Sequence, residues 1–455
     1  MKTKISLLLH TLLCVLCLAS CDKFLDITPT GKVIPATGEE FRSLMTNAYN
    51  SLPSDRGLTC LRSDEVQMPT GADYATSIDA YLNIWSWQDD LADDVTTSFS
   101  WRMFYQVLYI ANYIIEHQGE ITDIKAAERS QLVGEAYMLR AYMHFTLANL
   151  FAEPYTHCDP ANTRGIPLKL NSDVNEVLRN SRLDKVYEQI LADIAEAAVL
   201  MNVEKWGEGE TYRFNRLSAW CLYSRVFLYM GNYADALTNA KVVIKEHPAL
   251  EELSGNVLPN HYQSVEAIAS TEMVITAQYK SSFWVNRDFV SLYRTGDYRK
   301  SKFFKAETAS KYTLLKAGSG TGSSTTQSVN AFRCTFRSAE FYLTAAECAL
   351  RTGDRAAALD YFLQLAAKRY NTSVFDKYKA EWEAMTDEAL LDEILNERAR
   401  ELAFEGHRWF DLRRTTRPAL TKTYRNVTYT LDAKDKRYTL KIPTEAIAAN
   451  PGLAE

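Results

Sequence analysis

The sequence lacks the features that mark several large classes of protein. Its net charge is −6 at pH 7, its basic residues form no stripe, and no helix-turn-helix pattern appears, so a nucleic-acid partner is excluded. Neither a Gly-x-Ser-x-Gly elbow nor a His-Glu-x-x-His motif is present, so two common hydrolase signatures are missing. What remains, in 455 residues of 47% hydrophobic and 24% charged composition, is an ordinary globular protein with one large core or two moderate ones.

The N-terminus has the pattern of a lipoprotein leader. In MKTKISLLLHTLLCVLCLASC two lysines precede an apolar run that is too short to span a bilayer. The run ends in Leu18-Ala19-Ser20-Cys21, a lipobox, in which the cysteine thiol takes the lipid. We therefore predict a signal peptide over residues 1–20 and a lipidated Cys21. The alternative is a plain signal peptide that is cleaved elsewhere and leaves Cys21 free.

Few cysteines remain after the leader, and they form no pattern. They are Cys60, Cys158, Cys221, Cys334 and Cys348. The number is odd and none of them lies in a Cys-x-x-Cys pair, so we expect neither an obligatory disulfide framework nor a zinc site. Cys221 and Cys348 fall inside apolar helical patterns, which predicts packed small side chains.

The dominant periodicity of the chain is helical. Residues 101–116 and 128–151 carry apolar side chains on nearly every face, as helices buried on several sides do. Residues 181–201 keep one apolar stripe and begin with Ser181 as a candidate cap. These segments predict long, paired, antiparallel helices.

An internal repeat strengthens this prediction. Residues 219–248 follow the tetratricopeptide pattern, with Gly231 at the turn and Ala236 in the second helix. Residues 339–369 repeat it, with Gly353 and Ala358 at the same separation. Glycine permits positive φ and alanine lets helices approach closely. The fold class is therefore mainly α, a tetratricopeptide-like helical repeat scaffold.

Between the two copies the sequence changes character. Residues 249–336 contain short mixed segments such as MVITAQY at 273–279, followed by KAGSGTGSSTTQS at 316–328, which has the composition of an exposed loop. We divide the mature chain into an N-terminal helical region (21–248), an irregular, loop-rich, ligand-facing insertion (249–336) and a C-terminal region (337–455). Insertions on a rigid scaffold commonly carry function.

The segment NERARELAFEGHRWFDLRR, residues 396–414, is dense in charge. Read as one helix from about Asp387, it places Leu391, Leu395, Leu402 and Trp409 on one side, and stacks Glu397, Glu401 and Glu405 at a spacing of four. Stacked like charges repel, so they require cations. A hydrolase would use two of these glutamates with His407, but carboxylates on one helix face cannot flank a sugar from two sides. We favour a buried ion network; the candidate cations are Arg140, Arg225, Arg337, Arg398 and Arg408.

This segment also resembles the C-terminal signature of the SusD/RagB family of Bacteroidetes outer-membrane lipoproteins. Further segments resemble family landmarks in the family's order: CDKFLDITPTGK, WRMFYQVLYIANYIIE, GEAYMLRAYMHFTLANLF, GIPL, LYRTGDYRK, RSAEFYLTAAE and IPTEAIAANPGL. The resemblance implies a tetratricopeptide-like scaffold with no catalytic residues and no cofactor, anchored to the outer membrane by its lipid. It also implies a SusC-like TonB-dependent transporter as partner, over which the protein sits as a lid. The chain is shorter than most members, mainly in the ligand-facing insertion.

A receptor for glycans requires aromatic platforms, because sugar C–H faces stack on indole and phenol rings. Two segments offer them, and the candidate ligand-binding residues are Tyr74, Tyr81, Trp85 and Trp87 in residues 73–94, and Trp284 and Asn286 in the insertion. We expect at least one of Trp85 and Trp87 to be an exposed platform; core packing is the alternative for each tryptophan. Trp101, Trp206, Trp220, Trp382 and Trp409 are assigned to structure.

Three classes of function remain open. The favoured hypothesis is a non-catalytic surface lipoprotein that captures oligosaccharides, or in the same role peptides or other nutrients, for its transporter. A tetratricopeptide scaffold for envelope assembly and a secreted hydrolase are the alternatives. No metal ligands are expected in any of them.

Overall fold

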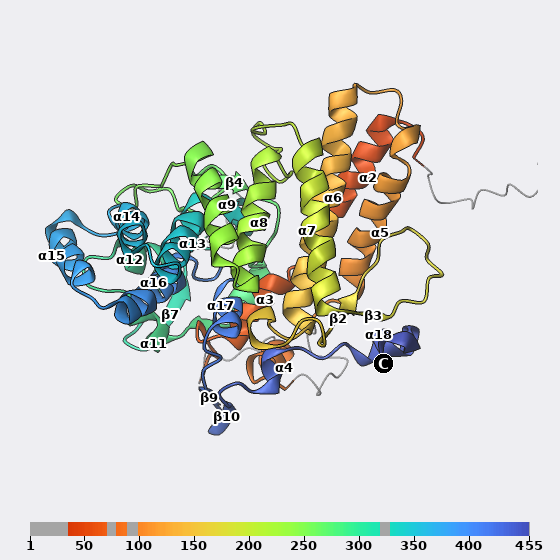
Figure 1. Cartoon of the computed structure of the whole chain (residues 1–455). Helices are drawn as coiled ribbons and strands as arrows, with labels where there is room; N and C mark the ends of the chain where they lie inside the picture. The colour runs from red at the N-terminus through yellow and green to blue at the C-terminus, as the bar shows by residue number, and fades with distance from the viewer. Residues whose placement is uncertain (1–34, 71–78, 89–98, 319–327, 455) are drawn as a thin grey trace, which may run out of the picture.

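The computed structural model describes residues 35–70, 79–88, 99–318 and 328–454. Long helices side by side form one layer across the molecule (Figure 1). Its N-terminal members are α2 (Gly38–Asn50), α5 (Arg102–Glu116), α6 (Ala126–Phe151) and α7 (Leu183–Leu200). Its central and C-terminal members are α8 (Arg216–Met230), α9 (Tyr233–Glu246), α13 (Ser338–Arg351), α14 (Arg355–Ala366), α15 (Thr372–Glu383) and α16 (Asp387–Glu401).

The two predicted repeats are helix pairs, α8–α9 and α13–α14. Gly231 and Gly353, just after the first helix of each pair, have φ of 75° and 88°, which is the left-handed conformation that glycine adopts without strain. Ala236 and Ala358 are fully buried where the second helix meets the first. Helices α9 and α13 also pack together, so the pairs form one continuous array. The mainly helical fold class is confirmed.

The two apolar segments at 101–116 and 128–151 are confirmed as helices α5 and α6, and α6 is buried along nearly its whole length after the first turn. The expected cap of α7 is wrong. Its N-cap residue is Arg182, and no side chain caps the helix. Ser181 instead lies in the short strand β3 (Asn180–Arg182), which pairs with β2 (Arg164–Pro167) and leads directly into the helix.

Short strands and helices make up the insertion. A four-stranded antiparallel sheet has the order β1-β5-β7-β6, in which β1 comes from the N-terminal region. Its strands are β1 (Val66–Gln67), β5 (Trp284–Val285), β7 (Tyr312–Leu314) and β6 (Phe304–Ala306). A second pair joins β4 (Ala267–Ala269) to β8 (Phe336–Arg337), and the short helices here are α10 (Ala277–Ser281), α11 (Arg287–Val290) and α12 (Tyr298–Phe303).

The predicted helix that begins at Asp387 is shorter than expected. It ends at Glu401, and a turn with positive φ at Phe404 (58°) and Gly406 (70°) leads into α17 (Arg408–Arg414). Trp409 therefore lies on a different helix from Leu391, and the single stripe that we predicted is broken. A glycine at 406 is required because a Cβ there would lie 2.7 Å from the carbonyl oxygen of Arg56. A hairpin of β9 (Leu420–Tyr424) and β10 (Val427–Leu431) and the short helix α18 (Thr444–Ala449) complete the chain.

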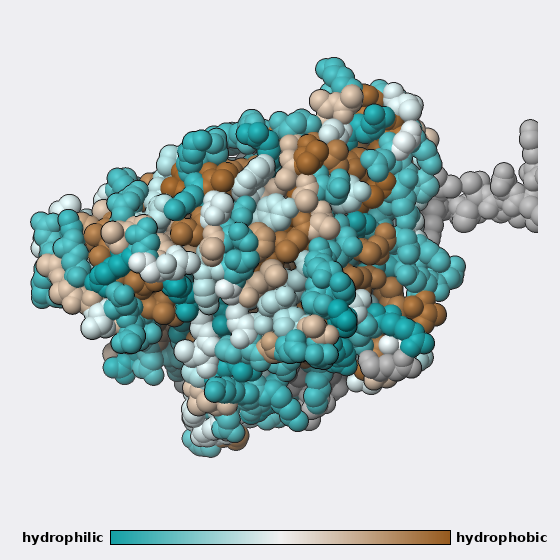
Figure 2. All heavy atoms as spheres, in the orientation of Figure 1, coloured by the Kyte–Doolittle hydropathy of each residue, from teal (hydrophilic) through white to brown (hydrophobic). Residues whose placement is uncertain are grey.

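The described cysteines are all free thiols, and Cys221 and Cys348 are buried in α8 and α13 as expected. Within the described ranges no helix is both long and apolar enough to cross a membrane. Figure 2 shows apolar residues scattered among polar ones over the face in view. The predicted signal peptide and Cys21 lie outside the described residues.

Candidate functional site

Glu397 and Glu401 on α16 and Glu405 in the turn after it are the centre of a buried ion network. Glu401, fully buried at the end of α16, accepts hydrogen bonds from three arginines. Arg337 donates to its Oε1 at 2.6 Å, Arg369 to both oxygens at 2.8 and 2.9 Å, and Arg299 to Oε2 at 3.0 Å. The structural interpretation of this segment agrees with these contacts.

The flanking glutamates extend the network. Glu397 binds Arg299 and Arg400, and Glu405 binds Arg337 and Lys316. The buried members are five carboxylates and five cations, and the partly exposed Glu393 also pairs with Arg400. The carboxylates are Glu266, Asp297, Glu397, Glu401 and Glu405, and the cations are Arg299, Lys316, Arg337, Arg369 and Arg400. Removal of one carboxylate therefore leaves a buried positive charge without its counter-charge.

The other predicted cations have different partners. Of the five candidates, Arg337 alone joins the glutamates. The remaining pairs are Arg140–Asp193, Arg225–Glu340, Arg398–Asp411 and Arg408–Asp64. Lys316, Arg299 and Arg369 were missed because they reach α16 from the insertion and from the segment after α14, and nothing in their local sequence marks them as its partners. Arg400 lies three residues after Glu397 on α16, a spacing that could have identified it.

The electrostatics of the network argue against acid–base chemistry by these residues. Burial by itself raises the pKa of Glu405, but Arg337 and Lys316 outweigh it and hold that pKa at about 2. Burial and the nearby Arg56 keep the pKa of His407 well below its usual value, so its ring is neutral. Glycoside hydrolysis needs one carboxyl that stays protonated near neutral pH, and Glu405 does not.

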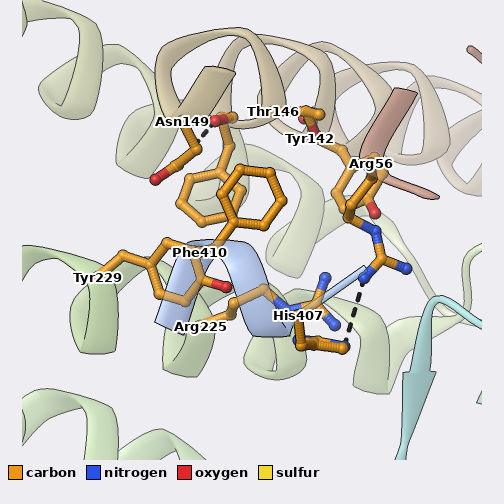
Figure 3. Close-up of a pocket in the computed structure, with 9 residues that line it drawn as sticks. Arg56, Tyr142, Thr146, Asn149, Arg225, Tyr229, His407 and Phe410 are labelled. Atoms are coloured by element: carbon orange, nitrogen blue, oxygen red, sulfur yellow. Dashed lines mark hydrogen bonds between the residues drawn. The ribbon is translucent and has the colours of Figure 1, made fainter. Parts of the chain in front are cut away.

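The space beside His407 is too small for a ligand. Figure 3 shows this pocket, with Arg56 donating toward His407 at 3.3 Å and Tyr142, Arg225 and Phe410 around it. Its cavity volume is about 10 Å³, which is the space of a single water molecule. The space beside His407 therefore offers no room for a sugar ring.

The expectation of an exposed platform at Trp85 or Trp87 is wrong. Both indoles are 1% exposed, at the end of helix α4 (Asp79–Trp85) and just after it. Trp85 donates its ring N–H to the carbonyl of Val66 at 3.0 Å, and Trp87 donates to the carbonyl of Arg62 at 2.9 Å. These acceptors are backbone atoms, so no side-chain pattern in the sequence reveals them.

A lysine from the C-terminal hairpin completes this cluster. The ammonium of Lys422 lies 4.3 Å from the ring centroid of Trp87 and 5.2 Å from that of Trp85, and donates to the carbonyls of Leu61 and Trp85. Tyr81 is also buried, 5% exposed, with its ring against Tyr279. None of the three predicted rings has a face open to a sugar. Tyr74 lies outside the described residues.

Trp284 is the predicted aromatic that stays half-buried, on β5. Val285 beside it points inward and is fully buried, so the indole points to the outer face of the sheet. Asn286 follows directly and caps α11, accepting the N–H of Asp288 at 2.9 Å. That bond gives Asn286 a structural role, and a ligand contact by either residue stays a prediction.

Register places polar side chains beside Trp284. Gln67 on β1 is its direct partner, and Lys305 on β6 is the partner of Thr313 on β7. Because Val285 pairs with Tyr312, Trp284 lies opposite Thr313. Residues opposite one another share a face, so a row of Gln67, Trp284, Thr313 and Lys305 crosses the sheet. We call this row the outer sheet face; its polar members were missed because their strands are two or three residues long.

The helical-repeat scaffold and the buried signature segment define the class of fold to which the chain belongs. A family model described as "Starch-binding associating with outer membrane" matches residues 23–228, and the SusD family model matches residues 293–455. Together the two models cover most of the chain. The chain belongs to the SusD/RagB family.

Relatives of known structure or curated name agree with this assignment. A SusD-like protein of Formosa agariphila is 22% identical, over 96% of this chain and 95% of its own. A SusD superfamily protein from Bacteroides fragilis has a TM-score of 0.76 at 20% identity, over 93% of this chain and 100% of its own. A structure described as a putative sugar binding protein from Bacteroides vulgatus has a TM-score of 0.73 at 20% identity, over 93% and 98%. At these identities the solved structures establish the fold.

Proposed function

We propose that this protein is a non-catalytic nutrient-binding lipoprotein of the outer membrane, which captures oligosaccharides and passes them to a SusC-like TonB-dependent transporter. The observation that carries the proposal is the outer sheet face, where Trp284 lies half-buried between hydrogen-bonding side chains. An indole supplies the flat apolar surface that a sugar ring stacks on, and Gln67 and Thr313 supply partners for hydroxyl groups. The family membership and the sugar-binding description of a structural relative support the same reading.

Lys311 affects the free energy of ligand binding at this surface. Its ammonium lies 5.0 Å from the centroid of the Trp284 ring, so in the free protein a flexible chain covers part of the indole. An exposed cation–π contact contributes about 0.5–1 kcal/mol. A stacked tryptophan at a recognition hot spot contributes about 2 kcal/mol or more. A sugar that stacks on Trp284 can therefore displace the ammonium of Lys311 with a net gain in binding free energy.

The proposal also includes the anchor and the partner. The lipobox that ends at Cys21 supplies a lipid attachment point, and a chain held at the membrane surface can close over a transporter. The hydrolase alternative gains no support from the described residues, in which the signature carboxylates are paired with cations.

The test is calorimetric titration of the mature protein with a panel of neutral oligosaccharides. Trp284→Ala should weaken binding roughly thirty-fold or more without lowering the melting temperature by more than about a degree. Trp220→Ala is the matched control, because Trp220 is half-buried on α8, away from the outer sheet face. Equal affinity of wild type and Trp284→Ala for every oligosaccharide would place the ligand elsewhere.

A further inference from the structure

A groove of about 400 Å³ opens at the far end of the helical layer from the sheet. It lies between the first turns of α2 and α6 and the irregular segment 202–213 that follows α7. In Figure 1 these first turns are at the upper right and β7 is at the lower left. The volume of the groove is in the range of small-molecule sites. The groove shares no residue with the outer sheet face.

The floor of the groove is held rigid by one buried carboxylate. Glu135, fully buried on α6, accepts hydrogen bonds from Arg42 at 2.9 Å, Tyr49 at 3.0 Å and Arg213 at 3.1 Å. Gln131 also donates to Glu135 through its amide nitrogen. Its amide oxygen accepts hydrogen bonds from the backbone N–H groups of residues 202 and 203. These bonds tie the irregular segment to α6, so the groove is formed before any ligand arrives.

The wall of the groove is aromatic. Trp206, which the sequence led us to assign to structure, donates its ring N–H to the carbonyl of Phe214 at 3.0 Å but remains half-buried. The guanidinium of Arg213 stacks 3.5 Å from its ring centroid, which fixes the orientation of the indole. Ile124, Leu132 and Val203 continue the apolar surface.

The charges select the kind of occupant. Arg42 and Arg213 share the carboxylate of Glu135, and Arg213 also pairs with Glu210 at 2.9 Å. Glu39 and Glu128 place exposed carboxylates at the mouth, where Lys125 lies 3.8 Å from Glu128. The groove therefore offers no excess of positive charge to an anionic ligand. Carboxylate oxygens accept from hydroxyl groups. The guanidinium of Arg42, whose side chain is 26% exposed, lines the groove and provides N–H donors. An indole, acceptors and a donor around an apolar wall match a neutral sugar ring, which has a C–H face and hydroxyl edges.

We infer that this groove is a second sugar site, which binds a pyranose unit of a neutral oligosaccharide independently of Trp284. Two sites at opposite ends of one molecule would let it hold a long glycan at two points and raise its apparent affinity. The inference does not depend on the outer sheet face, because it rests on Trp206, Arg213 and Glu135.

The test uses the mature Trp284→Ala protein, so that the outer sheet face is disabled, and calorimetry with maltohexaose, cellohexaose, xylohexaose and mannohexaose. At least one of these should bind, and adding Trp206→Ala should weaken that binding roughly thirty-fold. Ala127→Trp should do the same, because Ala127 is an exposed helical position that lines the groove and a large ring there fills it. Adding Trp220→Ala should leave binding unchanged.

Several outcomes would overturn the inference. They are no binding of any of the four hexaoses, binding that both groove variants leave intact, or a loss with Trp206→Ala that Ala127→Trp does not reproduce. The last result would mean that Trp206 acts through the fold rather than through contact. Loss of binding with Trp284→Ala alone, with no residual groove binding, would support the proposed function and contradict the second site.

Discussion

Replacement of Glu401 by alanine should strongly destabilise the protein. Its carboxylate meets Arg299, Arg337 and Arg369, all with side chains at most 1% exposed. Without it, each of these three buried arginines loses one of its carboxylate partners. Breaking a buried ion pair by removing one partner costs about 3–5 kcal/mol, because the remaining charge is left unpaired. We expect a loss of at least 3 kcal/mol in the free energy of unfolding.

Two further variants separate charge from packing. Glu401→Gln keeps the size of the side chain and removes the charge, so it should also destabilise the protein. Asp392→Ala is the matched control, because Asp392 is exposed on the same helix and a surface substitution changes stability by about 0.5 kcal/mol or less.

The assay is urea unfolding followed by circular dichroism at pH 7. A Glu401→Ala protein as stable as Asp392→Ala would refute the network reasoning. If that protein had also lost turnover of a glycan, the hydrolase alternative would be favoured instead.

Three other predictions concern pH, the buried tryptophan and the lipid anchor. Burial raises the pKa of Glu405 and Glu347, but their arginine partners hold both at about 2 against an ordinary 4.5. A carboxyl group whose pKa is lower in the folded than in the unfolded protein stabilises the fold at pH values above its unfolded pKa. Each of these two groups therefore contributes about 3 kcal/mol to the free energy of unfolding, and this contribution is lost as the pH falls from about 4.5 to 2. Melting curves over that range should show the loss, and Glu405→Gln should make it smaller, because only the contribution of Glu347 then remains of the two. Trp87→Ala should cost about 3–5 kcal/mol as a core truncation; urea unfolding of a variant as stable as wild type would contradict its burial. Cys21→Ala should abolish incorporation of labelled palmitate, and a labelled variant would refute the anchor.

The helical layer could be predicted because its signal is local. Apolar side chains at helical spacing identified α5 and α6, and the glycine–alanine pairs at 231–236 and 353–358 located two helix turns. The need for counter-charges was also readable, since stacked carboxylates on one helix are unstable alone. The break after Glu401 was not predicted, because Leu402, Ala403 and Glu405 are residues that helices accept, while the backbone turns at Phe404 and Gly406.

The candidate site could be predicted less well, for physical reasons that particular residues show. Trp85 and Trp87 looked like surface aromatics because aspartates surround them in the sequence, yet their ring N–H groups find carbonyls on and next to α3 (Asp55–Arg62). Trp206 looked structural, yet it lines a groove whose floor is built from α2, α6 and a loop. Which face of an aromatic ring stays open is decided by elements far apart in the chain.

The central claim is non-catalytic capture of oligosaccharides, and it is tested most directly by recovering the ligand. Mature protein is dialysed to equilibrium against each fluorescently end-labelled hexaose, and the bound fraction is released and analysed by chromatography. The account predicts saturable binding, weakened in Trp284→Ala, with the bound sugar recovered at its full length. Shortened products that require the intact protein, or an absence of binding to any of the sugars, would contradict it.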